Sequence, residues 1–160
     1  MDDDRFQLDP PLYLVAGKTG CWRCHADMPV VAILCENIEN PDEGPYILSD
    51  TAKLSPELVD FVQRRCPTYR LTFSKTVGAK YYANNCPECG VISGDFYLHS
   101  EPGAPFFPTD PDDAASLMIE PIPIDHACFA RSGRGYGTGD LILRHAKRVG
   151  PPPTRSKSDT

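Results

Sequence analysis

Two C-x-x-C pairs constrain this chain more than any other feature of its sequence. The pairs read Cys21-Trp22-Arg23-Cys24 and Cys86-Pro87-Glu88-Cys89, and 61 residues separate them. Two cysteines at this spacing can reach one ion, and two such pairs supply the four tetrahedral thiolates of a structural zinc site. We therefore predict that Cys21, Cys24, Cys86 and Cys89 bind one structural zinc ion.

The residues around the pairs favour tight turns. Pro87 and Gly90 suit a zinc knuckle, because glycine can adopt the left-handed conformation that closes the turn. The first pair has His25 at the corresponding position, which departs from that pattern. Each pair also lies between two β-prone runs, so the sequence contains a faint repeat. Loop-closure entropy grows only with the logarithm of length, so the long separation remains compatible with one shared ion.

The chain shows no sign of export or membrane insertion. Its first residues lack the basic start and apolar run of a secretory signal, and no stretch approaches the roughly 20 apolar residues that cross a bilayer. We expect a soluble cytoplasmic protein. In a reducing compartment, seven cysteines favour metal or redox chemistry over a disulfide framework.

Three other functions share these cysteines. Cys21 to His25 matches the C-x-x-C-H pattern of covalent haem attachment, but that chemistry requires export. A thiol-disulfide role for Cys86 and Cys89 would favour a following helix, whereas the sequence from Val91 to Leu98 predicts a strand. A zinc deaminase needs H-x-E ahead of its cysteine pair, and His99 follows the pair instead.

The remaining pattern predicts an α+β fold: zinc-ribbon-like antiparallel β-hairpins with an inserted helix and loop-rich connections. Ser55 and Pro56 signal the start of that helix, Leu58, Phe61, Val62 and Cys66 share its apolar face, and Pro67 ends it. Seventeen prolines favour short strands and loops. The predicted loops span residues 37–51 and 101–115. The predicted strands span residues 12–16, 29–35, 69–73, 80–83, 91–99, 118–124 and 141–145.

These elements predict one domain. We expect an acidic amino-terminal segment over residues 1–10, a single zinc-stabilised domain over residues 11–149, and a disordered tail over residues 150–160. The tail begins with three prolines and continues with polar residues.

Charge is distributed unevenly along the chain. Residues 1–130 hold 20 acidic and 9 basic residues, net −11, while residues 131–160 hold 2 acidic and 7 basic residues, net +5. The basic end suggests RNA or single-stranded DNA binding as an alternative function. The candidate nucleic-acid-binding residues are Arg131, Arg134, Tyr136, Arg144, Lys147 and Arg148.

A hydrolase is a further alternative. His99 and Glu101, with Asp95 and His126 as possible helpers, could perform acid-base catalysis if they converge in one pocket. Cys35, Cys66 and Cys128 are expected to be small core residues rather than ligands. His126 and Cys128 could hold a second metal only with partners that the sequence does not reveal.

The stretch from Tyr81 to Pro102, preceded by Cys21-Trp22-Arg23-Cys24, resembles a group of uncharacterised bacterial proteins with paired zinc knuckles. The resemblance covers roughly residues 12–107. It implies a zinc-ribbon-like fold and no established activity.

Four thiolates would fill a tetrahedral zinc site and leave no position for a substrate or an activated water. We therefore expect a non-catalytic zinc-binding module that mediates interaction with a protein partner.

Overall fold

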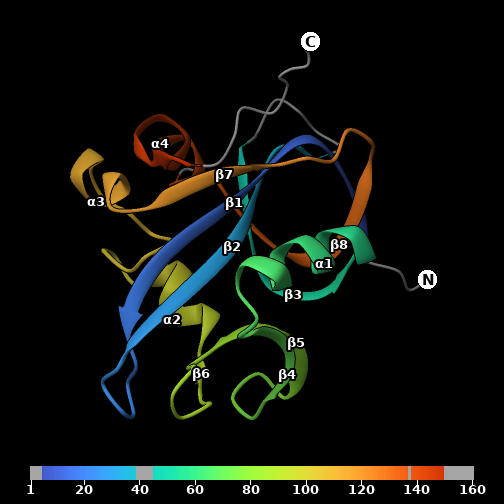
Figure 1. Ribbon diagram of the computed structural model, residues 1–160. Coiled ribbons are helices and arrows are strands. Elements are labelled where there is room, and N and C mark those ends of the chain that lie inside the picture. Colours follow the sequence, from blue (N-terminus) through green and yellow to red (C-terminus); the bar gives the residue numbers. More distant parts are fainter. Residues whose placement is uncertain (1–4, 39–44, 137, 150–160) are drawn as a thin grey trace.

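The computed structural model describes residues 5–38, 45–136 and 138–149 of the chain, with the side chains of residues 37, 38, 96, 134 and 136 left out. Strands dominate it, and four short helices lie between them (Figure 1). Of these described helices, none has the length and apolarity that a membrane span requires. The elements are β1 (Phe6–Gly20), β2 (Asp27–Ile38), β3 (Tyr46–Leu54), α1 (Pro56–Arg65), β4 (Tyr69–Ser74), β5 (Ala79–Asn85), β6 (Ile92–Ser93), α2 (Asp95–Ser100), α3 (Pro111–Ala115), β7 (Met118–Ile122), β8 (Cys128–Tyr136), α4 (Thr138–His145) and β9 (Lys147–Arg148).

Four strands close into a small barrel. β1 pairs with β2, β2 with β3, β3 with β8, and β8 returns to β1, all antiparallel. β7 extends the sheet from β1, and β9 follows in parallel. The predicted α+β fold of zinc-ribbon-like hairpins is therefore wrong. The structure is mainly β, and the hairpins that carry the two C-x-x-C pairs are parts of larger sheets.

β1 is long, and along one of its edges it pairs with two different strands. Residues Phe6 to Leu8 pair with β8, and residues Leu12 to Ala16 pair with β7. The register shifts between Asp9 and Leu12, where Pro10 and Pro11 supply no backbone donor to the ladder. β1 begins at Phe6, inside the segment 1–10 that was predicted to be an acidic amino-terminal segment. The predicted tail, residues 150–160, lies outside the described residues.

Both faces of β2 are buried, which explains its nearly continuous apolar sequence. Because side chains alternate across a strand, Val31, Ile33 and Cys35 enter one core cluster and the residues between them enter a second. The first cluster fills the barrel and includes Leu58, Phe61 and Val62 of α1. The second lies outside the barrel and includes Leu98 of α2, Ile142 of α4 and the site cysteines Cys21 and Cys86.

The predicted helix is confirmed as α1, with its apolar face buried. Ser55 occupies the N-cap position, but its side chain makes no cap hydrogen bond. Its Oγ instead accepts a hydrogen bond from the backbone N–H of Phe129, at 2.8 Å. This contact joins the start of α1 to β8.

Four local predictions are wrong. The predicted loop 101–115 contains the short helix α3. Residues 141–145 form part of α4 rather than a strand, because Ile142 and Ala146 lie one turn apart and both bury on the second cluster. Of residues 91–99, only Ile92–Ser93 form a strand, and α2 follows. The predicted loop 37–51 contains the first half of β3, whose residues Tyr46 to Leu48 are buried.

Along the chain, between β3 and β7, a separate three-stranded sheet forms in the order β4-β5-β6. In Figure 1 it lies at the lower end of the molecule, near the turn that joins β1 to β2. This placement brings the second C-x-x-C pair, which connects β5 to β6, toward the first.

Candidate metal centre

Each C-x-x-C pair is the turn of an antiparallel hairpin. Cys21 and Cys24 connect β1 to β2, where Gly20 pairs with Asp27. Cys86 and Cys89 connect β5 to β6, where Asn85 pairs with Ile92. The faint sequence repeat therefore corresponds to two hairpins, each with a C-x-x-C pair in its turn.

The two turns have matching hydrogen bonds. Cys21 N–H donates to Ala26 O at 2.9 Å, and Cys86 N–H donates to Val91 O at 2.8 Å. The fifth residue of each turn donates back to the first cysteine: His25 N–H to Cys21 O at 3.0 Å, and Gly90 N–H to Cys86 O at 2.9 Å. Each turn therefore presents its two thiols in the same way.

His25 takes the place that glycine takes in the second turn. Its φ is +66°, and the φ of Gly90 is +83°. A left-handed φ is costly for a residue with a side chain, so the rest of the turn must hold His25 there. The departure noted in the sequence leaves the geometry of the knuckle unchanged.

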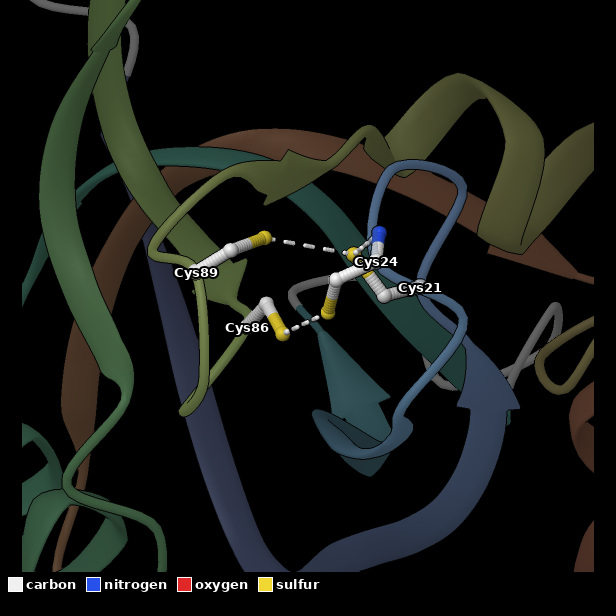
Figure 2. Close-up of side chains that lie close together, drawn as sticks. All are labelled: Cys21, Cys24, Cys86 and Cys89. Carbon is white, nitrogen blue, oxygen red and sulfur yellow. Dashed lines mark hydrogen bonds between the residues drawn. The ribbon is translucent and has the colours of Figure 1, made fainter.

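The four sulfurs meet in one cluster (Figure 2). Cys21 Sγ lies 3.5 Å from Cys89 Sγ, and Cys24 Sγ lies 3.6 Å from Cys86 Sγ. All four sulfurs lie within 4.8 Å of one another. Zinc–sulfur bonds of about 2.3 Å in a tetrahedron place sulfurs about 3.8 Å apart. The separations therefore suit one metal ion and are too long for disulfide bonds.

Backbone amides favour the thiolate form of the first cysteine in each turn. Hydrogen bonds from backbone N–H groups, chiefly that of Cys24, lower the pKa of Cys21 to about 6 despite its burial. The N–H groups of Cys89 and Glu88 likewise lower the pKa of Cys86. For Cys24, the N–H of Ala26 lowers the pKa, but partial desolvation of the thiol and hydrogen bonds to the neighbouring sulfurs outweigh it and raise the pKa to about 12. A bound cation would supply the positive charge that lets all four thiols ionise.

A further contact links the two turns without any metal. Trp22 is exposed, yet its Nε1–H donates to Ile92 O at 2.8 Å. Cys21 and Cys86 are buried in the second core cluster, while Cys24 and Cys89 are exposed. The cluster thus lies at the edge of the packed interior.

The two main candidate hydrolase residues, His99 and Glu101, do not line either of the two cavities that the structure describes. The His99 ring is buried and lies 5.0 Å from the ring of Phe106, and burial lowers its pKa to about 4. Glu101 is exposed at the end of α2. Asp95 Oδ2 lies 3.9 Å from His99 Nε2, too far for a hydrogen bond.

His126 and Cys128 gain the partner that the sequence did not reveal, namely Glu57. The three ligand atoms lie within 4.8 Å of one another, and His126 Nε2 lies 2.6 Å from Glu57 Oε2. Hydrogen bonds to Glu57 and Asp125 raise the pKa of His126, and burial raises that of Cys128. Both shifts favour the protonated forms, so the contact between His126 and Glu57 is an ion pair beside a buried thiol, and a cation would have to displace these protons.

The candidate nucleic-acid-binding residues are divided among β8, α4 and β9. Arg144 pairs with Asp140 at 3.1 Å. Arg148 donates to Leu143 O and lies over the ring of Tyr13. Lys147 and Arg131 are exposed, and the side chains of Arg134 and Tyr136 lie outside the described structure. Nucleic-acid binding stays a prediction.

Asp50 is a residue that the sequence analysis missed. It has a φ of +50° at an irregularity in the pairing of β3 with β8, and its N–H donates to Asp95 Oδ2 at 2.8 Å. The sequence offered no signal for this pairing, because the two acids lie 45 positions apart.

No protein-family model, curated protein or solved structure matches this chain. The resemblance to bacterial proteins with paired zinc knuckles therefore rests on the residues quoted for it. The structure itself provides a cluster of four cysteines that could hold a metal ion.

Proposed function

We propose that Cys21, Cys24, Cys86 and Cys89 bind one structural zinc ion in a non-catalytic module that binds a protein partner. The observation that supports the metal site is the convergence of four sulfurs, from two hairpin turns of the same geometry, within 4.8 Å. All-thiolate tetrahedral sites suit zinc or iron. Four thiolates saturate a tetrahedral zinc ion, so this site would stabilise structure rather than activate a substrate.

Elemental analysis of the purified full chain tests the metal. We expect one zinc per chain, a colourless protein, and loss of the metal in Cys21→Ser and Cys86→Ser. Cys35→Ser is the matched control, because Cys35 is a buried cysteine of the other core cluster. A protein without bound metal, or one that retains zinc after both site substitutions, would show that the proposal is wrong. A coloured protein that contains iron would show that the site holds iron rather than zinc.

An apolar groove supports the binding of a protein partner. A cavity of about 480 Å³ lies between the β1–β2 face, the end of α1 and the second knuckle. Pro29, Pro67, Pro87 and Met118 contribute to its walls. Of the described residues that line it, Arg65 and Glu120 are the charged ones, and they pair with each other at 2.8 Å. A groove whose charges are already paired favours an uncharged apolar segment of a partner protein.

Selection from a displayed random-peptide library tests this occupant. We expect peptides with a shared apolar motif whose affinity falls about tenfold or more in Met118→Glu, because a carboxylate would then face an apolar side chain. Leu71→Glu is the matched control, since Leu71 is similarly exposed, 47% against 43%, but lines neither cavity. Selection of charged peptides, or equal binding by Met118→Glu, would contradict the assignment.

A further inference from the structure

A second cavity of about 820 Å³ lies beside the two knuckles. Its volume falls within the usual range for small-molecule sites. Three parts of the molecule form it: the knuckle turns, β3 with the start of α2, and the β4–β5 turn. The lining residues used below are Trp22, Asp50, Phe73, Lys75, Val77 and Asp95.

Asp95 lines this cavity with a buried carboxyl group. Its side chain is 6% exposed. Oδ2 accepts a hydrogen bond from Asp50 N–H, whereas Oδ1 has no hydrogen-bond partner among the described residues. The backbone N–H of Asp95 donates to the hydroxyl of Tyr81 at 3.2 Å, which holds the start of α2 in place. A buried carboxylate oxygen without a donor is costly, so a donor in the cavity would be stabilised there.

Asp50 brings a second carboxyl group to the same cavity. It is one of two described residues other than glycine with a positive φ, and it lies where the β3–β8 register shifts between Ser49 and Lys53. Such irregularities reorient side chains next to functional sites. Here the irregularity directs the backbone N–H of Asp50 toward the carboxyl group of Asp95, and both residues line the same cavity.

The walls around these acids are apolar and exposed. Trp22, Phe73 and Val77 are 65%, 54% and 53% exposed, unusually high values for large apolar side chains. The hydrogen bond from Trp22 to Ile92 O keeps the indole at the cavity. Lys75 also lines the cavity, so two carboxyl groups oppose one ammonium. The combination of carboxylates with an aromatic wall suits a cation attached to an apolar group.

We propose that this cavity binds a small organic cation, a primary ammonium joined to an apolar or aromatic group, with the ammonium between the carboxyl groups of Asp50 and Asp95. Asp95 Oδ1 is closed to solvent in this structure, so a small shift of the side chain would let it accept from the ammonium. Trp22 and Phe73 would cover the apolar part. The site needs the knuckles to be folded but does not depend on which metal they hold.

Phenethylamine is a suitable probe, and 2-phenylethanol is its neutral counterpart. The full chain, loaded with zinc and labelled with ¹⁵N, is titrated with each compound at pH 8. Burial raises the pKa of Asp95 to about 7, so its carboxyl group is ionised under these conditions. We expect saturable shifts of the Asp50 and Asp95 amides and of the Trp22 indole, with the amine binding at least about tenfold more tightly than the alcohol.

Asp95→Asn keeps an acceptor for the N–H of Asp50 and removes the charge. We expect it to weaken the amine at least about tenfold and to leave the alcohol unchanged. Asp112→Asn, an exposed acid of α3 outside the cavity, should change neither. Equal affinity for amine and alcohol, absence of saturable shifts, or unchanged amine binding by a folded Asp95→Asn would overturn the proposal. If that variant fails to fold, the comparison of the two compounds on the unsubstituted chain decides.

Discussion

Asp95 and His99 are a buried pair of residues whose pKa values are shifted so that each favours its neutral form. Burial, partly offset by the hydrogen bond from Asp50 N–H, raises the pKa of Asp95 to about 7. Burial lowers the pKa of His99 to about 4. Between these values both groups are uncharged, although they lie only 3.9 Å apart. Burial raises the pKa values of Tyr69 and Tyr81, and the charge of nearby Asp95 raises them further.

Asp95→Asn should change how stability depends on pH. The folded protein holds the Asp95 proton more tightly than the unfolded chain does, so this group lowers the free energy of unfolding as pH rises toward 7. His99 acts in the opposite direction, because its depressed pKa makes the folded state more stable as pH rises from about 4 to about 6.5. As pH rises from about 5.5 to about 8, the free energy of unfolding of Asp95→Asn should increase by about 2 kcal/mol relative to that of the unsubstituted protein.

Urea unfolding of both proteins across this range measures the difference. Asp112→Asn serves as the control, because an exposed acid on α3 should leave the pH profile parallel to that of the unsubstituted protein. Parallel profiles for Asp95→Asn as well would mean that the Asp95 carboxyl group titrates normally.

At the scale of elements, the two knuckle turns are the same structure built with different residues. His25→Gly should raise the free energy of unfolding by up to about 1 kcal/mol, because glycine adopts a φ of +66° without the penalty of a side chain. Gly90→Ala should lower it by about 1 to 2 kcal/mol. A Cβ at Gly90 would meet no atom within 4 Å, so this loss would come from backbone strain alone.

Thermal unfolding of the zinc-loaded variants tests both changes. Gly20→Ala is the control, because an added Cβ there also meets no atom within 4 Å and Gly20 has no positive φ. If Gly90→Ala matched Gly20→Ala, the turn would not require the left-handed conformation.

At the scale of the whole molecule, the barrel and the knuckles draw on different core clusters. The cluster inside the barrel contains none of the four site cysteines, whereas the outer cluster contains Cys21 and Cys86. Classical zinc fingers unfold without metal because they have little other core. This chain has a barrel core of its own, so metal removal should loosen it locally rather than unfold it.

Hydrogen exchange after removal of the metal by a chelator tests this expectation. The amides of Cys86 and Gly90 and the short strand β6 should exchange faster, while β3 and β8 keep their protection. Cys21→Ser should reproduce the pattern, and Cys35→Ser with zinc bound should not. Loss of protection throughout the barrel would show instead that the metal holds the entire fold.

Local elements whose signals lie close together along the chain could be predicted without the structure. The C-x-x-C pairs, the helix that begins at Pro56 and the strands around residues 12–16, 29–35 and 69–73 could be predicted, because turn chemistry and apolar periodicity act over a few residues. The apolar face of α1 belongs to the same class of local signals.

The barrel, the helical conformation of α4 and the pairing of Asp50 with Asp95 depend on contacts between distant segments and could not be predicted. Closure depends on β8 returning to β1, a contact between residues more than 100 positions apart, which no local pattern records. Residues 141–145 contain Leu141-Ile142-Leu143, a β-prone run, but burial of Ile142 and Ala146 on the outer cluster outweighs that preference and makes a helix. Packing between distant segments thus chose among conformations that the local sequence allowed.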